Sequence, residues 1–215
     1  MRFFCVSTME DLARLIEEIG ILPFFPTSVP GWSLEENIHP DVWFTDAEGP
    51  WEWKGLMASR KQCVYGKFIR GKAAFVSLPF FRHLANWRRE SMPFEERVGL
   101  GLISHRDQMI YDYHTRFPGT QARVLRQQFG SKGIDTALTR LEMSTFVVTQ
   151  STAYNIAKDG HPYGWGNSVF ITADAWLGDF VEPVSSVDSL HFILEHLASR
   201  MPDVHTDRLR SELRM

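Results

Sequence analysis

Residues 120–143 read TQARVLRQQFGSKGIDTALTRLEM, and this stretch decides the expected fold. Thr120 is placed to cap a helix over residues 121–128, and the GSKG segment at 130–133 predicts a sharp turn. A second helix is expected over residues 134–143, since its apolar side chains recur at helical spacing. Its expected buried face consists of Ile134, Ala137, Leu138 and Leu141. The stretch therefore predicts a helix-turn-helix pair.

The flanking sequence extends this pair into a larger unit. Residues 106–116 predict a preceding helix that ends at the Phe-Pro-Gly of 117–119. After the pair, residues 145–150, 153–157 and 165–172 are strand-like, and Asp159-Gly160 is a hairpin signal. Three helices followed by a two- or three-stranded hairpin predict a winged helix-turn-helix unit over residues 106–172.

The N-terminal half mixes helices with one hairpin. Residues 9–19 predict a helix that Thr8 caps and Gly20 ends, and the SLEE at 33–36 is a capping pattern. Residues 62–77 read as strand, turn and strand, and a helical period returns over residues 78–89. We therefore expect an α+β protein in which a mixed α/β-hairpin region, residues 1–103, packs on a winged-helix domain, residues 104–178. Residues 179–215 are expected to form a helical extension.

Composition narrows the class of protein. The 215 residues are 44% hydrophobic and 23% charged, as in ordinary soluble proteins, and no run of apolar residues is long enough for a membrane span. Cys5 and Cys63 match no metal or redox spacing, and the eight histidines are scattered. We expect a cytoplasmic protein with reduced, buried thiols, without a metal or cofactor and without a membrane contact.

The net charge of −3 conceals a strong segregation of charge. The first 53 residues hold ten acidic residues against two basic ones, a net charge of −8. Residues 54–89 contain nine cations and no acid, and residues 113–134 form a second acid-free run with four cations. A polyanion responds to such local fields, which favours a nucleic-acid partner. The alternative is that the cations pair with the acidic N-terminal segment across the fold.

The predicted elements place polar side chains where DNA contacts are expected. The exposed face of the third helix would read bases or clamp phosphates, the second helix and the basic hairpin would hold the backbone, and the hairpin tip would touch a groove. The candidate DNA-binding residues are Lys54, Lys67, Arg70, Lys72, Arg123, Arg126, Lys132, Thr136, Thr139, Arg140, Lys158, His161 and Tyr163. Because Asp135, Glu142 and Asp159 dilute this face, a protein-protein interaction module remains the alternative. The mixed charge favours backbone or shape recognition of double-stranded DNA over base readout.

The segment GPWEWKG at 49–55 is the most unusual in the chain. In a strand, Trp51 and Trp53 would share one face and Glu52 the other. Such a pair of indoles could stack an unpaired base beside a carboxylate. The alternative is two core tryptophans, with Glu52 bonded to Lys54 or to a backbone amide.

Four segments in order resemble the bacterial AlkZ-related proteins, which are short relatives of the winged-helix DNA glycosylases. They are GPWEWKG at 49–55, YGKF at 65–68, TRLEM at 139–143 and PYGWG at 162–166. The resemblance implies a winged-helix fold and kinship with enzymes that excise alkylated or crosslinked bases. Those glycosylases position water with a Gln-x-Gln or Gln-x-Asp pair, which this sequence lacks. If base excision occurs, Glu52 is the first carboxylate to test as the water-activating base.

Overall fold

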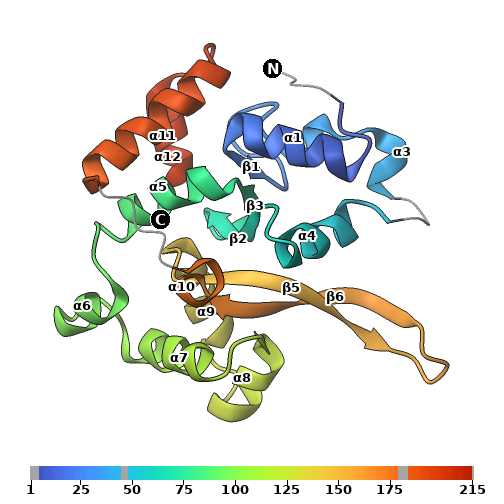
Figure 1. The fold of residues 1–215 in the computed structure, drawn as a ribbon, viewed down its shortest axis with the longest axis vertical. Coiled ribbons are helices and arrows are strands. Elements are labelled where there is room, and N and C mark those ends of the chain that lie inside the picture. The colour runs from blue at the N-terminus through green and yellow to red at the C-terminus, as the bar shows by residue number, and fades with distance from the viewer. Residues whose placement is uncertain (1–4, 45–47, 179–183, 215) are drawn as a thin grey trace.

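The computed structural model describes residues 5–44, 48–178 and 184–214, with the backbone alone at 162–165. The chain is a mixed α+β protein whose helices surround one antiparallel sheet of six strands, ordered β1-β3-β2-β5-β6-β4 (Figure 1). The N-terminal elements are α1 (Met9–Ile19), β1 (Ile21–Pro23), α2 (Leu34–Asn37), α3 (Pro40–Trp43), α4 (Pro50–Ser59), β2 (Val64–Ile69), β3 (Lys72–Val76), α5 (Leu78–Arg88) and α6 (Phe94–Gly99). The remaining elements are α7 (His105–Arg116), β4 (Thr120–Gln121), α8 (Ala122–Phe129), α9 (Ile134–Met143), β5 (Val147–Ile156), β6 (Pro162–Thr172), α10 (Ala173–Leu177), α11 (Ser186–Arg200) and α12 (Thr206–Leu213).

Capping residues set several of these boundaries as expected. The Thr8 hydroxyl accepts the backbone N–H of Asp11, and the Asp11 carboxylate accepts that of Thr8, so α1 opens with a capping box. Gly20 ends α1 with a φ of 81°, which is a left-handed conformation that favours glycine. Ser33 and Glu36 form the same reciprocal cap on α2. The predicted bounds of α1 and α9 are both confirmed.

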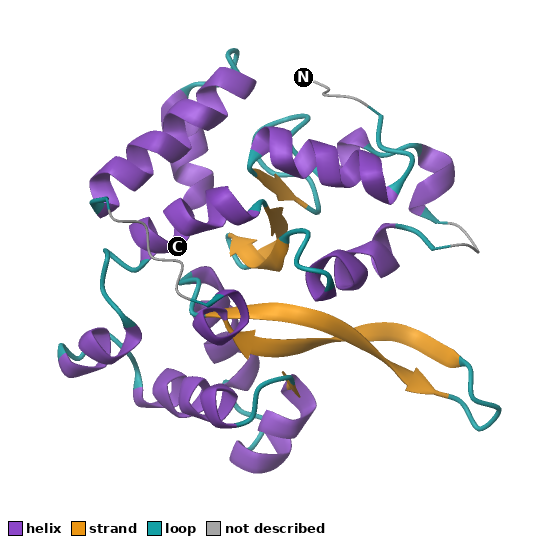
Figure 2. Cartoon of the chain, in the orientation of Figure 1, coloured by secondary structure: helices purple, strands orange, loops and turns teal. Residues whose placement is uncertain are grey.

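One sheet joins the two halves of the chain. β2 and β3 form the predicted antiparallel hairpin, and Tyr65 of β2 pairs with Thr149 of β5. β5 and β6 form a single long hairpin, where the sequence suggested separate strands over residues 145–150 and 153–157. The outer half of this hairpin projects from the body as a two-stranded arm (Figure 2).

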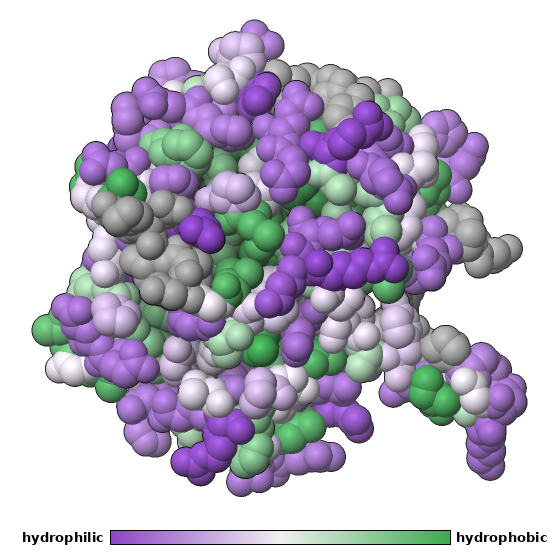
Figure 3. Space-filling model, in the orientation of Figure 1, coloured by the Kyte–Doolittle hydropathy of each residue, from purple (hydrophilic) through white to green (hydrophobic). Residues whose placement is uncertain are grey.

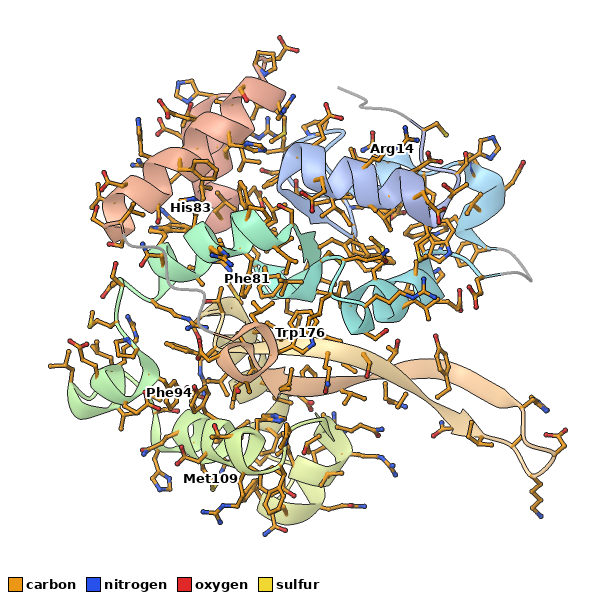
Figure 4. The ribbon with its side chains drawn as sticks, viewed as in Figure 1. Arg14, Phe81, His83, Phe94, Met109 and Trp176 are labelled. Carbon is orange, nitrogen blue, oxygen red and sulfur yellow. The ribbon has the colours of Figure 1, made fainter. Side chains whose placement is uncertain are left out.

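Buried apolar side chains form two clusters. The first joins α1, β1–β3, α4 and α5 to α10–α12, and contains Phe81 and Trp176 (Figure 4). The second lies among α6–α9 and the inner ends of β5 and β6, and includes Phe94. All four residues predicted for the buried face of α9 lie in the second cluster. The sheet therefore connects two separately packed regions.

The C-terminal half keeps the predicted order of three helices and a hairpin, with one correction. Thr120 does not cap α8: it belongs to β4, which pairs with Phe170 and Val169 of β6. Gln121 occupies the N-cap position without a side-chain hydrogen bond, and the Thr120 hydroxyl donates to the Phe117 carbonyl at 2.6 Å. Threonine is favoured both at helix N-caps and in strands. Here, pairing with the edge of β6 places Thr120 in a strand.

Two further expectations are wrong. Residues 50–59 form the helix α4, so the side chains of Trp51 and Trp53 do not alternate with Glu52 as they would in a strand. Cys63 is a buried free thiol, but the Cys5 thiol is free and exposed. Among the described residues, no helix has the length and apolar character needed to cross a membrane.

Candidate nucleic-acid interface

The basic β2–β3 hairpin lies directly against α9. The Lys67 ammonium donates a hydrogen bond to the Thr139 hydroxyl at 3.0 Å, and the Lys67 backbone N–H donates to the Glu142 carboxylate at 3.2 Å. At the hairpin turn, a Cβ on Gly71 would lie 3.3 Å from the Thr139 methyl group. Two of the predicted DNA-contacting segments, 65–72 and 136–140, therefore meet in space.

Glu142 is buried at this contact, although the sequence placed it on the exposed face of α9. Burial raises the pKa of its carboxyl to about 7, against the opposing effect of the Lys67 charge and backbone N–H. Burial is also the main cause of the raised pKa of Tyr65, and the charge of Glu142 raises it further. A Cβ on Gly66 would lie 2.8 Å from the Phe68 ring and 3.2 Å from a Glu142 oxygen, so the glycine leaves room for both side chains. Glu142 thus belongs to the packing between β2 and α9.

Arg126 of α8 and Arg140 of α9 already have acidic partners. Arg140 donates two hydrogen bonds to Asp107 of α7, at 2.7 and 3.0 Å, and this bidentate pair raises the pKa of Arg140. Arg126 donates to Asp135 at 2.6 Å. Thr136 is exposed, while the Thr139 hydroxyl donates to the Asp135 carbonyl. This face also lines a pocket of about 600 Å³ that Leu102, Ile103 and Met143 share with Thr136, Thr139 and Arg140.

A second group of candidate cations lacks acidic partners among the described residues. Lys72, Arg123, Lys132 and Lys158 are exposed and form no ion pair with another described residue. Arg123 donates to the neutral Gln121 side chain at 2.6 Å.

The remaining candidates are partly engaged. Arg70 lies 3.8 Å from Glu212. The Lys54 ammonium lies over the Trp51 ring, 5.0 Å from its centroid, and burial lowers its pKa. His161 pairs with Asp159 at the arm tip, and the Tyr163 side chain lies outside the described residues.

Two arginines of the first acid-free run are not available to an external anion. Arg88 is 2% exposed and donates to the carbonyls of Phe68, Met143 and Leu213. Burial lowers its pKa to about 9. Arg89 is also buried and pairs with Asp174 at 2.9 Å. Of the ion pairs described for this run, one leads to Glu212 and one to Asp174.

The Trp-Glu-Trp segment packs into the protein at the start of α4. Trp53 is 6% exposed in the first cluster, and the half-buried Trp51 ring contacts Phe24, Phe25 and Trp43 at centroid distances of 5.1 to 6.1 Å. The Glu52 carboxylate accepts the Gly49 backbone N–H at 2.9 Å, which caps the helix. The structure therefore gives each of these side chains a packing or capping contact.

The four segments quoted above come together as two pairs. YGKF at 65–68 meets TRLEM at 139–143 through the Lys67 contacts already described. GPWEWKG at 49–55 meets PYGWG at 162–166 across β5, because Thr152 fills the space in front of both Gly55 and Gly166. A Cβ would lie 1.5 Å from Thr152 Oγ1 at position 55 and 3.1 Å from its methyl group at position 166.

Comparison with known families gives one match. The family model described as AlkZ related matches residues 6–214, which is nearly the whole chain. The chain belongs to the AlkZ-related family. No curated protein and no solved structure matches it.

For the AlkZ-related chain, the sequence did not predict the burial of Arg88, Arg89 and Glu142 or the pairing of Asp107 with Arg140. Each is a charged residue that is buried or that contacts a residue distant in the sequence, whereas charged residues are usually exposed. A weak signal was present, since Glu142 and Asp107 fall on helices at positions that could turn inward. In the described ranges, no group of three or more His, Cys, Asp or Glu side chains is placed to hold a metal ion.

Proposed function

We propose that this protein binds double-stranded DNA, mainly through the phosphate backbone, and that α7, β4, α8, α9 and the β5–β6 hairpin act as a winged helix. The domain limits 1–103, 104–178 and 179–215 belong to the same proposal. The observation that carries it is the bond between Lys67 and Thr139, which puts the acid-free hairpin beside the third helix. Family membership supports it, since the family is named for its relation to AlkZ.

Some candidate cations are paired with acids and others are not. This difference supports recognition of the phosphate backbone over readout of the bases. Arg126 and Arg140 would have to leave Asp135 and Asp107 before they could contact a base. Lys72 and Lys132 have no acidic partner to leave among the described residues. Contacts that cost no broken ion pair are expected to form first, and ammonium groups bind phosphate without sequence information.

Salt dependence tests this proposal. The intact protein is titrated with a fluorescent duplex at rising salt, and the slope of log K against log salt gives the number of displaced counterions. We expect a slope of about −3 to −5, for four or five phosphate contacts. As a control, R200Q removes a cation at the far end of α11 and should leave the slope unchanged. No binding at about 50 mM salt, where electrostatic contacts are strong, contradicts the proposal.

A protein-interaction module without a nucleic-acid role is the competing candidate, and the paired cations on α8 and α9 favour it. Such a module would not bind duplex DNA, whatever the salt dependence of its protein contact. The titration therefore separates the two functions.

Base excision by Glu52 is a narrower hypothesis within the same proposal. A glycosylase would release free base from alkylated duplex, and the E52Q variant would lose this activity while keeping DNA affinity. Because Glu52 caps α4, its variant needs a folding control: Gln can also accept the Gly49 N–H, so the melting temperature should change little. Equal excision by E52Q and wild type removes Glu52 from the mechanism.

A further inference from the structure

The loop that follows α6 carries two leucines that are more than half exposed. Residues 99–103 read GLGLI, and the side chains of Leu100 and Leu102 are 61% and 52% exposed. The space-filling view shows hydrophobic atoms at the left edge of the surface, over α6 (Figure 3). Neighbouring exposed apolar side chains on one loop are a common mark of a contact with another molecule.

This loop is held in a defined shape. The backbone N–H groups of Leu100, Gly101 and Leu102 donate to carbonyls of α6, at 2.9 to 3.0 Å. Gly101 has a φ of 71°, the left-handed conformation that ends the helix. The leucines are therefore presented by an ordered turn, so little conformational entropy would be lost when they bind.

Gly99 gives an independent sign of a close partner. It is the last residue of α6, where glycine is less favourable than alanine by up to about 1 kcal/mol. Its φ is not positive, and a Cβ added there would meet no atom within 4 Å. Neither the backbone conformation nor the packing of the described chain requires glycine, whereas a partner approaching the backbone closely would.

The loop adjoins the proposed DNA-binding face. Leu102 and Ile103 line the same pocket as Thr136, Thr139 and Arg140 of α9, and Thr139 in turn bonds to Lys67 of the basic hairpin. The pocket and this hydrogen bond thus connect Leu102, across α9, to the basic hairpin. The acids that line this pocket, Asp107 and Asp135, are held in ion pairs.

We propose that the 99–103 loop is an apolar wedge that enters DNA between neighbouring base pairs while the cations hold the phosphates. Inserted leucines would replace part of the base stacking that they disrupt, and a glycine beside them would let the sugar-phosphate backbone come close. This inference rests on the proposed DNA binding and adds the element that deforms the duplex.

The test uses the full chain and a short duplex with a central 2-aminopurine, whose fluorescence rises when its stacking is lost. Wild type should raise the fluorescence on binding. L100S/L102S should reduce that increase to less than about one third, while its duplex affinity falls by less than about tenfold because the phosphate contacts persist. V187S, which removes an apolar side chain that is 73% exposed on α11, should behave as wild type.

G99A gives a second measurement that cannot be confused with misfolding, since its methyl group enters open space. It should keep or raise the melting temperature and reduce the fluorescence increase. Duplex binding without a fluorescence increase, or an increase that L100S/L102S retains, overturns the wedge and leaves the proposed DNA binding standing. Absence of duplex binding at about 50 mM salt overturns both.

Discussion

The β2–β3 hairpin and α9 lie side by side, but they differ in how far ion pairs neutralise their charged residues. On α9, Arg140 pairs with Asp107, and Asp135 pairs with Arg126 of α8. On the hairpin, the described residues offer the exposed Lys72 no acidic partner and offer Arg70 a distant one, Glu212 at 3.8 Å. The two elements join through Lys67, whose ammonium bonds to Thr139 and whose backbone bonds to Glu142.

This difference shows that the number of cations in a segment does not measure how strongly it attracts an anion. The internally compensated pairs of α8 and α9 stabilise the fold, while the uncompensated lysines leave a field outside it. Charge variants in the two regions should therefore differ in what they change. Those in compensated positions should alter stability, and those in uncompensated positions should alter binding.

The largest effect is expected at Arg88, which shares its acid-free run with the hairpin but is buried. R88M keeps the length of the side chain and leaves the carbonyls of Phe68, Met143 and Leu213 without their donor. We expect the free energy of unfolding to fall by about 4 kcal/mol in urea denaturation. An unchanged midpoint would mean that this arginine does not connect the two halves of the chain.

Glu142 should give the next largest effect, and one that depends on pH. Its folded-state pKa is raised to about 7, so folding favours the protonated carboxyl, and wild type loses stability as pH rises from about 4.5 to 7. The neutral E142Q variant lacks this loss and should be more stable than wild type by up to about 3 kcal/mol at pH 8. The difference should vanish below pH 4.5. A pH-independent difference would contradict burial of this carboxylate between β2 and α9.

Arg140 should show a smaller effect on stability. R140Q leaves the nearly buried Asp107 without its bidentate partner, and we expect a loss of about 1–2 kcal/mol. R126Q is the matched control, because the Arg126 and Asp135 side chains are 40% and 59% exposed and such solvated pairs contribute less than about 1 kcal/mol. Equal losses in thermal unfolding would remove the distinction between the two pairs.

Lys72 should give the smallest effect on stability. K72Q removes an exposed charge without a described partner, so the free energy of unfolding should change by less than about 0.5 kcal/mol. A larger loss by the same urea assay would show that the hairpin cation is compensated after all.

Much of the fold was predictable where local sequence and tertiary packing agree. In α1 and α9 the apolar spacing, the flanking glycines and the Thr8 cap specify the same bounds that packing selects. In α4, local sequence and tertiary packing do not agree. Apolar side chains fall on every side of PWEWKGLMAS, so the sequence shows no helical period. Contacts with Phe24, Trp43 and Thr152 determine where each side of the helix packs.

The charged residues were harder to place than the apolar ones. The local sequence identified Lys67, Arg70 and Lys72 as a basic hairpin, and the structure has that hairpin. It could not show that Arg88 turns inward, because its acceptors come from residues 68, 143 and 213. It also could not show that Asp107 neutralises Arg140, since a bond across 33 residues leaves no local pattern.

The most direct measurement of the central claim compares K72Q with R126Q in salt-dependent duplex binding. Both variants remove one exposed cation, but Arg126 already has Asp135 as its counterion and Lys72 has none among the described residues. We predict that K72Q makes the slope of log K against log salt shallower by about 0.9, the value for one lost phosphate contact, and that R126Q leaves it unchanged. A shallower slope for R126Q with wild-type behaviour for K72Q would contradict the assignment of DNA contact to the hairpin.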